Sequence, residues 1–233
     1  MKNLKTVWHC QFDKLKTLQV QNCEKIVVVF PSSMQKTCHN LEMLVVKDCA
    51  LVEEIFELTP NEKSSIEGTT QLKVITLGGL VKLKKIWGMD PQGILRFHNL
   101  QSVSLNQCES MEYLFPLSVA TCCSHLKELY IISCGKMKEI VSENRESTCA
   151  SPRFEFNQLK TILLWNLYSL KGFYSGNHTL ACPSLRTLDV SKCAKLHLHK
   201  TETLSTCSLE RCQDEKLPYL FQQPLFIVEE VCI

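Results

Sequence analysis

One motif occurs twice in this chain, 85 positions apart, over residues 12–34 and 97–119. The repeated residues are apolar, cysteine or turn-forming, and in the first copy they are Phe12, Leu15, Leu18, Val20, Cys23, Ile26, Phe30, Pro31 and Ser33. The match continues from Leu41 and Leu126, and a third copy begins at Leu185. A period this regular indicates a solenoid. Repeat arrays usually bind through extended surfaces, so the period favours recognition over catalysis.

Each 85-residue super-repeat contains a shorter unit, L-x-x-L-x-L/V-x-x-C-x-x-L/I/M. About seven units open at Leu15, Leu41, Leu72, Leu100, Leu126, Leu159 and Leu185. Their spacing of 26 to 33 residues is that of leucine-rich repeats or slightly longer. The L-x-L alternation predicts a short strand with one buried and one exposed face. We therefore expect an α/β leucine-rich-repeat solenoid, or horseshoe, with a concave parallel β-sheet and loops or short helices on the convex side.

The chain divides into an array over residues 1–196 and an irregular connector with the start of a further repeat over 197–233. Polar stretches at 57–70 and 142–157 are predicted to be loops on one edge of the solenoid. Short helices are expected at about 32–39 and 117–125, each introduced by Pro and Ser. Neither end shows the polar outer face of a capping repeat, so we expect a piece of a longer protein.

The 14 cysteines are explained largely by the repeat. One slot, three residues after the predicted strand, holds Cys23, Cys49, Cys108, Cys134 and Cys193. A thiol there is expected to form a structural ladder, as a small buried hydrophobe and weak donor to the backbone. The first ten residues contain no signal-peptide core, and no apolar run is long enough to span a membrane. The sequence therefore predicts reduced thiols and a cytoplasmic location.

Signals for other chemistry are weak. His197, His199, Cys207 and Cys212 have the residue types of a zinc site, but their spacing is looser than in structural sites. No nucleophile elbow, metalloprotease motif or carboxylate pair stands apart from the repeat, so we expect no enzyme, no metal and no cofactor. With 26 basic and 24 acidic residues, the chain has no net field for nucleic acid or an anionic membrane.

The full motif is F-x-x-L-K-x-L-x-V-x-x-C-x-x-L/I-x-x-x-F-P-x-S, followed by L-x-x-L-x-V-x-x-C-x-x-x-E-E-I. Over about residues 1–196 it resembles the leucine-rich-repeat region of plant intracellular coiled-coil, nucleotide-binding disease-resistance proteins. The resemblance implies a role in innate immunity, with autoinhibitory contacts and a pathogen effector, a guarded host protein or the receptor's own nucleotide-binding domain as partner. The chain contains no G-x-x-x-x-G-K-[S/T] loop, so recognition is implied without the nucleotide switch. The alternative is a free-standing adaptor or scaffold with no immune role.

Alternation also predicts which side chains line the concave face. Tyr130, Ile132, Leu163 and Trp165 should stand side by side there, with Glu128 and Asp189 nearby. Aromatic anchors dominate the energetics of protein interfaces, so these six residues are the predicted partner-binding site. A second interpretation is that the loop at 142–157 or a neighbouring domain packs against them.

Overall fold

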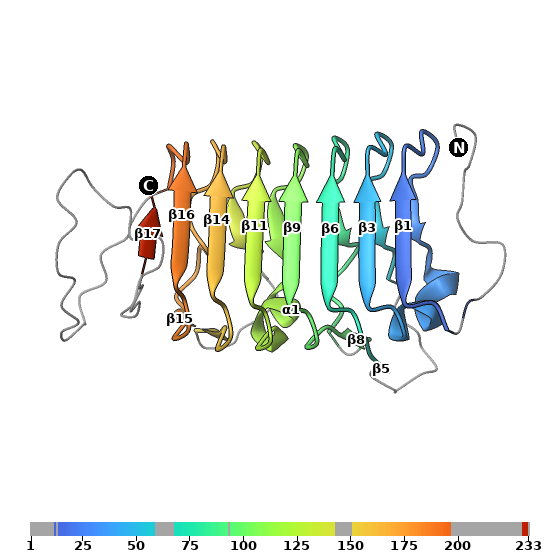
Figure 1. Ribbon diagram of the computed structural model, residues 1–233, viewed down its shortest axis with the longest axis horizontal. Coiled ribbons are helices and arrows are strands. Elements are labelled where there is room, and N and C mark those ends of the chain that lie inside the picture. The colour runs from blue at the N-terminus through green and yellow to red at the C-terminus, as the bar shows by residue number, and fades with distance from the viewer. Residues whose placement is uncertain are drawn as a thin grey trace.

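The structure is a computed structural model that describes residues 12, 14–58, 68–92, 94–142, 151–196 and 230–232. Its backbone is a parallel solenoid built on one long sheet, here called the main sheet (Figure 1). The leucine-rich-repeat architecture predicted from the sequence is thereby confirmed. The strands of the main sheet are, in spatial order, β1 (Thr17–Gln21), β3 (Met43–Lys47), β6 (Val74–Gly78), β9 (Ser102–Asn106), β11 (Glu128–Ile132), β14 (Thr161–Trp165), β16 (Thr187–Ser191) and β17 (Glu230–Cys232).

Hydrophobic burial fixes the orientation of these strands. The second and fourth residues of each repeat strand point into the core, as Leu44 and Val46 do in β3, where both are fully buried. The intervening residues are exposed or half-buried and form what we call the open face, the concave side of the prediction. Neighbouring strands pair without a register shift, so each open-face position stacks on its equivalent in the next unit. A unit buries its apolar side only against its neighbours, which makes the array cooperative.

The chain reverses after each main-sheet strand from β1 to β16 through one residue in the left-handed region. Six of these residues are not glycine, with φ between 53 and 56°, namely Asn22, Asp48, Gln107, Ser133, Asn166 and Lys192. Gly79 holds the same position in the third unit, with φ 64°. The amide of Asn22, for example, donates to the Lys47 carbonyl at 3.1 Å. This ladder of hydrogen bonds extends the pairing of the main sheet beyond the strands themselves.

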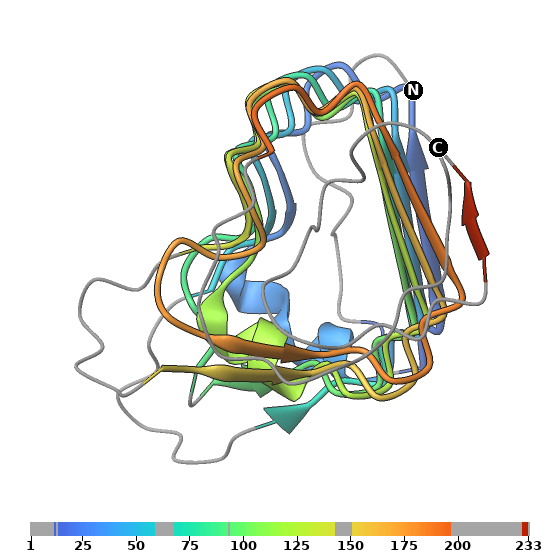
Figure 2. The ribbon, with the colours of Figure 1, turned by 90° about the vertical axis from the view of Figure 1, so that its left-hand side faces the viewer.

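Short strands form the second side of the solenoid, as the view along its axis shows (Figure 2). They are β2 (Val28–Phe30), β4 (Glu54–Phe56), β7 (Lys85–Trp87), β10 (Tyr113–Phe115) and β12 (Glu139–Val141). Aromatic rings at their ends stack through the core. The ring centroids of Phe56 lie 5.1 Å from Phe30 and 6.5 Å from Trp87, and Trp87 meets the edge of Phe97 at 5.3 Å. All four rings are buried, so this stack ties the first four units together.

The third side carries two short helices, η1 (Ser32–His39) and α1 (Leu117–Cys122). Both lie where helices were predicted, although η1 is a 3-10 helix rather than an α-helix. Each follows an extended proline, and a carboxylate from another unit accepts a hydrogen bond from an amide of the first turn. The Glu57 carboxylate accepts from the Ser32 amide at 3.0 Å, and Asp90 accepts from the Ser118 amide at 3.3 Å. These bonds satisfy donors that a helix end leaves unpaired.

The prediction that 57–70 and 142–157 are entirely loops is wrong at their ends. Residues Gly68–Thr69 form β5, which pairs with β8 (Leu95–Arg96), and Arg153–Glu155 form β13, which pairs with β15 (Thr179–Ala181). In β13 the buried Phe154 lies between two exposed charged residues, an alternation that favours a strand once a neighbouring unit offers a partner. The middle of both stretches, and the connector at 197–229, lie outside the described residues.

Candidate protein-binding face

The four apolar residues predicted to meet on the open face are adjacent in the structure. In the register of β11 and β14, Tyr130 is opposite Leu163 and Ile132 is opposite Trp165. We call these four residues the apolar patch. The side chains on each flank are small or polar, because Ser104 pairs with Tyr130 from β9 and Ser191 pairs with Trp165 from β16. Trp165 keeps 38% of its surface exposed although it belongs to the most apolar part of the face.

Hydrogen bonding fixes the orientation of the tryptophan. Its indole Nε1 donates to Asp189 Oδ1 across the strand boundary, at 2.8 Å. Leu163 is opposite Asp189 in the β14–β16 register, so the acidic residue borders the patch directly. Burial raises the pKa of the Tyr130 phenol, with a smaller contribution from the nearby Glu128 carboxylate. The phenol therefore stays protonated at neutral pH and can donate a hydrogen bond to a partner.

Glu128, the other acidic residue of the predicted site, faces the opposite direction. Its carboxylate accepts a hydrogen bond from the Ser102 hydroxyl of β9 at 3.2 Å. Ser102 belongs to the strand on the far side of β11 from the patch residues of β14. The structure thus brings Asp189 into contact with the patch, whereas Glu128 is directed toward β9.

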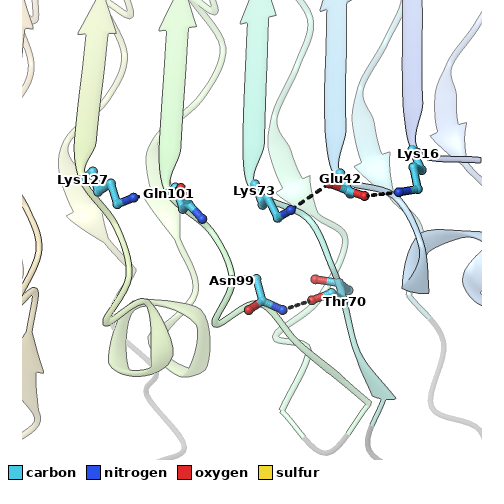
Figure 3. Close-up of polar contacts among 7 residues, drawn as sticks. All are labelled: Lys16, Glu42, Thr70, Lys73, Asn99, Gln101 and Lys127. Carbon is cyan, nitrogen blue, oxygen red and sulfur yellow. Dashed lines mark hydrogen bonds and ion pairs between the residues drawn. The ribbon is translucent and has the colours of Figure 1, made fainter.

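A second set of side chains stands at the beginning of the main-sheet strands. One residue immediately precedes each strand, and we call the set the edge row: Lys16, Glu42, Lys73, Gln101, Lys127, Lys160 and Arg186. Figure 3 shows the first five in line along the edge of the main sheet. Glu42 pairs with Lys16 at 3.0 Å and with Lys73 at 2.7 Å. Hydrogen bonds from Lys73 and then Lys16 lower the pKa of the Glu42 carboxyl to about 2.

The edge row was not singled out in the sequence, although a signal for it exists. Each member directly follows the opening leucine of its unit, as Lys16 follows Leu15 and Lys160 follows Leu159. Aligning the units on that leucine places these residues in one column. Their charges come together only because the in-register pairing of the strands stacks the column in space.

The cysteine slot lies at the turn that follows the main-sheet strands. Cys23, Cys49, Cys108 and Cys134 are buried, Cys193 is partly buried, and all five thiols are free. Each sulfur lies 3.2 to 3.7 Å from the carbonyl oxygen two residues earlier. Burial raises the pKa of Cys49 and Cys193, which keeps the proton that such a contact needs. These contacts agree with a structural ladder.

The sequence also raised the questions of a metal site and a membrane span. No group of three or more His, Cys, Asp or Glu side chains is arranged there to hold a metal ion. The residues His197, His199, Cys207 and Cys212 lie outside the described residues. In the described part of the chain, neither helix has the length and hydropathy needed to cross a membrane.

The stacked units, the single parallel sheet and the exposed patch define a leucine-rich-repeat protein. Residues 1–135 match the family model described as plant disease resistance protein RPS2-like, leucine-rich repeats. The match covers more than half of the chain, so the chain belongs to this family. The match also confirms the resemblance seen in the sequence motifs. No curated protein and no solved structure gives a significant match.

Proposed function

We propose that this chain recognises protein in plant immune sensing and that the apolar patch is its contact surface. The observation that carries the proposal is the pairing of Tyr130 with Leu163 and of Ile132 with Trp165 on an exposed sheet face. Membership of a resistance-protein repeat family supports the immune context. The partner is a pathogen effector, a guarded host protein or the nucleotide-binding domain of the same receptor. The chain acts in the cytoplasm by binding rather than by catalysis.

Pre-organisation supports this assignment of the patch. Large aromatic side chains carry much of the binding energy at interfaces, and their contribution is greatest when they are already held in place. The hydrogen bond from the Trp165 indole to Asp189 restrains that ring before any partner arrives. Main-sheet pairing on both sides also restrains the backbone under the patch. A partner would therefore lose little conformational entropy from this surface on binding.

The proposal is tested by removing both rings with Tyr130→Ala and Trp165→Ala together. The full chain, fused to a proximity-labelling enzyme, is expressed in leaf cells with and without pathogen challenge. We expect the double variant to lose defence-related proteins that the unaltered chain labels. Truncation of two central aromatic anchors weakens binding by about tenfold to several hundredfold, which removes labelling at cellular concentrations.

Met43→Ala provides the matched control, because Met43 is also an apolar open-face residue, 36% exposed, in the second unit. This variant should label the same proteins as the unaltered chain. Thermal melting of all three proteins checks that the array is folded at the assay temperature. If the double variant labelled an unchanged set of proteins, the patch would not be the recognition surface.

A further inference from the structure

The edge row changes character along the solenoid. In the first three units, Glu42 stands between two lysines and pairs with both. In the last three units, the members of the row are Lys127, Lys160 and Arg186, and none of them is acidic. Lys127 Nζ donates to the neutral Gln101 amide oxygen at 3.1 Å, and no ion pair found among the described residues involves Lys160. The row therefore ends in consecutive cations.

The charges of residues 12–196 follow the same division. Residues 124–196 contain ten basic and six acidic side chains, whereas residues 12–123 contain eleven basic and twelve acidic ones. The formal net charge of +2 for the chain hides this difference. The units that carry the apolar patch are thus the basic units, and the near-neutral units before them balance their charges internally.

The cations and the patch belong to the same strands. Lys127 immediately precedes β11, which carries Tyr130, and Lys160 immediately precedes β14, which carries Leu163. Each cation comes three positions before its patch residue, which is about 10 Å along an extended chain. Adjacent cations of the row are one strand spacing apart, or about 5 Å. A partner whose carboxylates lie about 10 Å from an apolar side chain could therefore contact the cations and the apolar patch at the same time.

The two carboxylates on this part of the open face are already engaged within the protein. Glu128 accepts from Ser102 on the side away from β14, and Asp189 accepts from the Trp165 indole. They would still repel a continuous phosphate backbone laid over the patch. Nucleic-acid sites without sequence specificity combine stacking residues with a charged groove that follows the backbone for several nucleotides. A single row of cations at one edge of an apolar patch instead suits a partner that is acidic at one end only.

We infer that the last three units bind an acidic protein segment that carries an aromatic or aliphatic anchor. Its carboxylates lie on Lys127 and Lys160, with Arg186 next in the row, and its anchor covers the apolar patch. The inference rests on the proposed function, because it gives the chemistry of the protein that the same surface recognises. Charge complementarity at the edge sets the orientation of the segment and speeds its association, while the patch supplies most of the affinity.

The test begins with a displayed library of random peptides selected on the purified full chain. We expect the recovered peptides to combine Asp or Glu with Trp, Phe or Leu. The best of them is then labelled and titrated by fluorescence anisotropy against the unaltered chain and its variants. Lys127→Gln and Lys160→Gln together remove the two cations while keeping side chains of similar length, and Lys16→Gln is the matched control in the first unit, where the lysine is 75% exposed.

The double lysine variant should bind the peptide about threefold to tenfold more weakly, the range expected for losing two exposed charge pairs. The Lys16→Gln control should bind it as the unaltered chain does. Affinity should also fall as salt is raised, and this dependence should be weaker in the double variant, because screening acts on the pairs that have been removed.

Three outcomes would overturn the inference, and they differ in what they say about the patch. The selection could recover apolar peptides without acidic residues that no longer bind the Tyr130→Ala/Trp165→Ala variant. This result would support the proposed function but contradict the inference that the partner is acidic. Peptides that bind this variant unchanged, or no selected peptides at all, would remove both. A labelled single-stranded oligonucleotide that binds as tightly as the peptide, through the same lysines, would point to nucleic acid instead.

Discussion

The first three and the last three units share a backbone but differ in what they expose. In the first three, the edge row forms the alternating set Lys16, Glu42 and Lys73, and every charge in it has a partner of opposite sign. In the last three, the row is basic throughout, and the strands that follow it carry two aromatic rings on the open face. The strands of both regions pair in the same register and bury the same positions. Within the main sheet, the difference therefore lies in the exposed side chains.

This contrast separates folding from recognition in one array. Buried leucines, the cysteine slot and the left-handed turn recur in both regions because stacking requires them. Exposed positions are free of that requirement, so a few units can acquire a binding surface without cost to their neighbours. The first three units also expose an apolar residue, Met43, but it has no aromatic neighbour on the adjoining β6 and the charges at their edge are internally paired.

The largest expected effect is a difference in stability loss between two tryptophan variants, one in the first three units and one in the last three. Trp87→Ala removes a fully buried ring that packs against Phe56 and Phe97, and should lower the free energy of unfolding by about 3–5 kcal/mol. Trp165→Ala removes a partly exposed ring and should cost about 1–2 kcal/mol. Urea denaturation of both variants measures the two losses. Equal losses would mean that the patch is part of the core and not a free surface.

A smaller effect is expected at the left-handed turns. The first units place Asn22, Asp48 and Gly79 there, residues that tolerate positive φ, whereas the last unit places Lys192 there with φ 56°. Lys192→Gly should raise the free energy of unfolding by about 0.5–1 kcal/mol, because relief of the left-handed strain exceeds the added entropy of the unfolded chain. Asn22→Gly should change it by less than half as much. Thermal denaturation of the pair checks the difference, and a destabilised Lys192→Gly variant would contradict it.

Lys160→Glu would give the edge row of the last three units the same alternation of charge as in the first three. A carboxylate between Lys127 and Arg186 should stabilise the fold by a few tenths of a kcal/mol, as exposed ion pairs do. The same change should weaken binding of the acidic peptide more than Lys160→Gln does, because it replaces an attraction with a repulsion. Calorimetry and the anisotropy titration measure the two effects separately. A variant that gained stability and kept its peptide affinity would show that the row is structural only.

The smallest expected effect is the pH dependence of the stability that Glu42 contributes in the first three units of the edge row. The folded pKa of Glu42, about 2, lies below its ordinary value of 4.5, so its contribution to stability is complete above pH 4.5. That contribution should be lost as the pH falls from 4.5 through 2, and Glu42→Gln should abolish this part of the dependence. An NMR titration of the Glu42 carboxyl gives its midpoint directly. A midpoint near 4.5 would mean that the pairs with Lys73 and Lys16 do not persist in solution.

Much of the fold was predictable because the unit repeats. The opening leucines marked the start of each unit, and L-x-L alternation predicted the side chains that share a face, including Tyr130 with Leu163. The short strands β5 and β13 were missed because each is two or three residues long and forms only by pairing with the next unit. The left-handed turn had a partial signal in Asn22, Asp48, Gly79 and Asn166, but the other three residues there carry no such preference.

The sequence alone determined the architecture, because repeated units with one apolar side bury that side by stacking on one another. It also determined the two faces of every strand, because side chains alternate along extended chain. Only the tertiary structure decided which charges meet, because Glu42 reaches Lys73 across 31 residues through strand register. It likewise decided that Asp189 holds Trp165 and that Lys127 and Lys160 lie at the same end of two paired strands, the ones that carry the patch. Contacts between units depend on side-chain direction and strand spacing, which no single unit encodes.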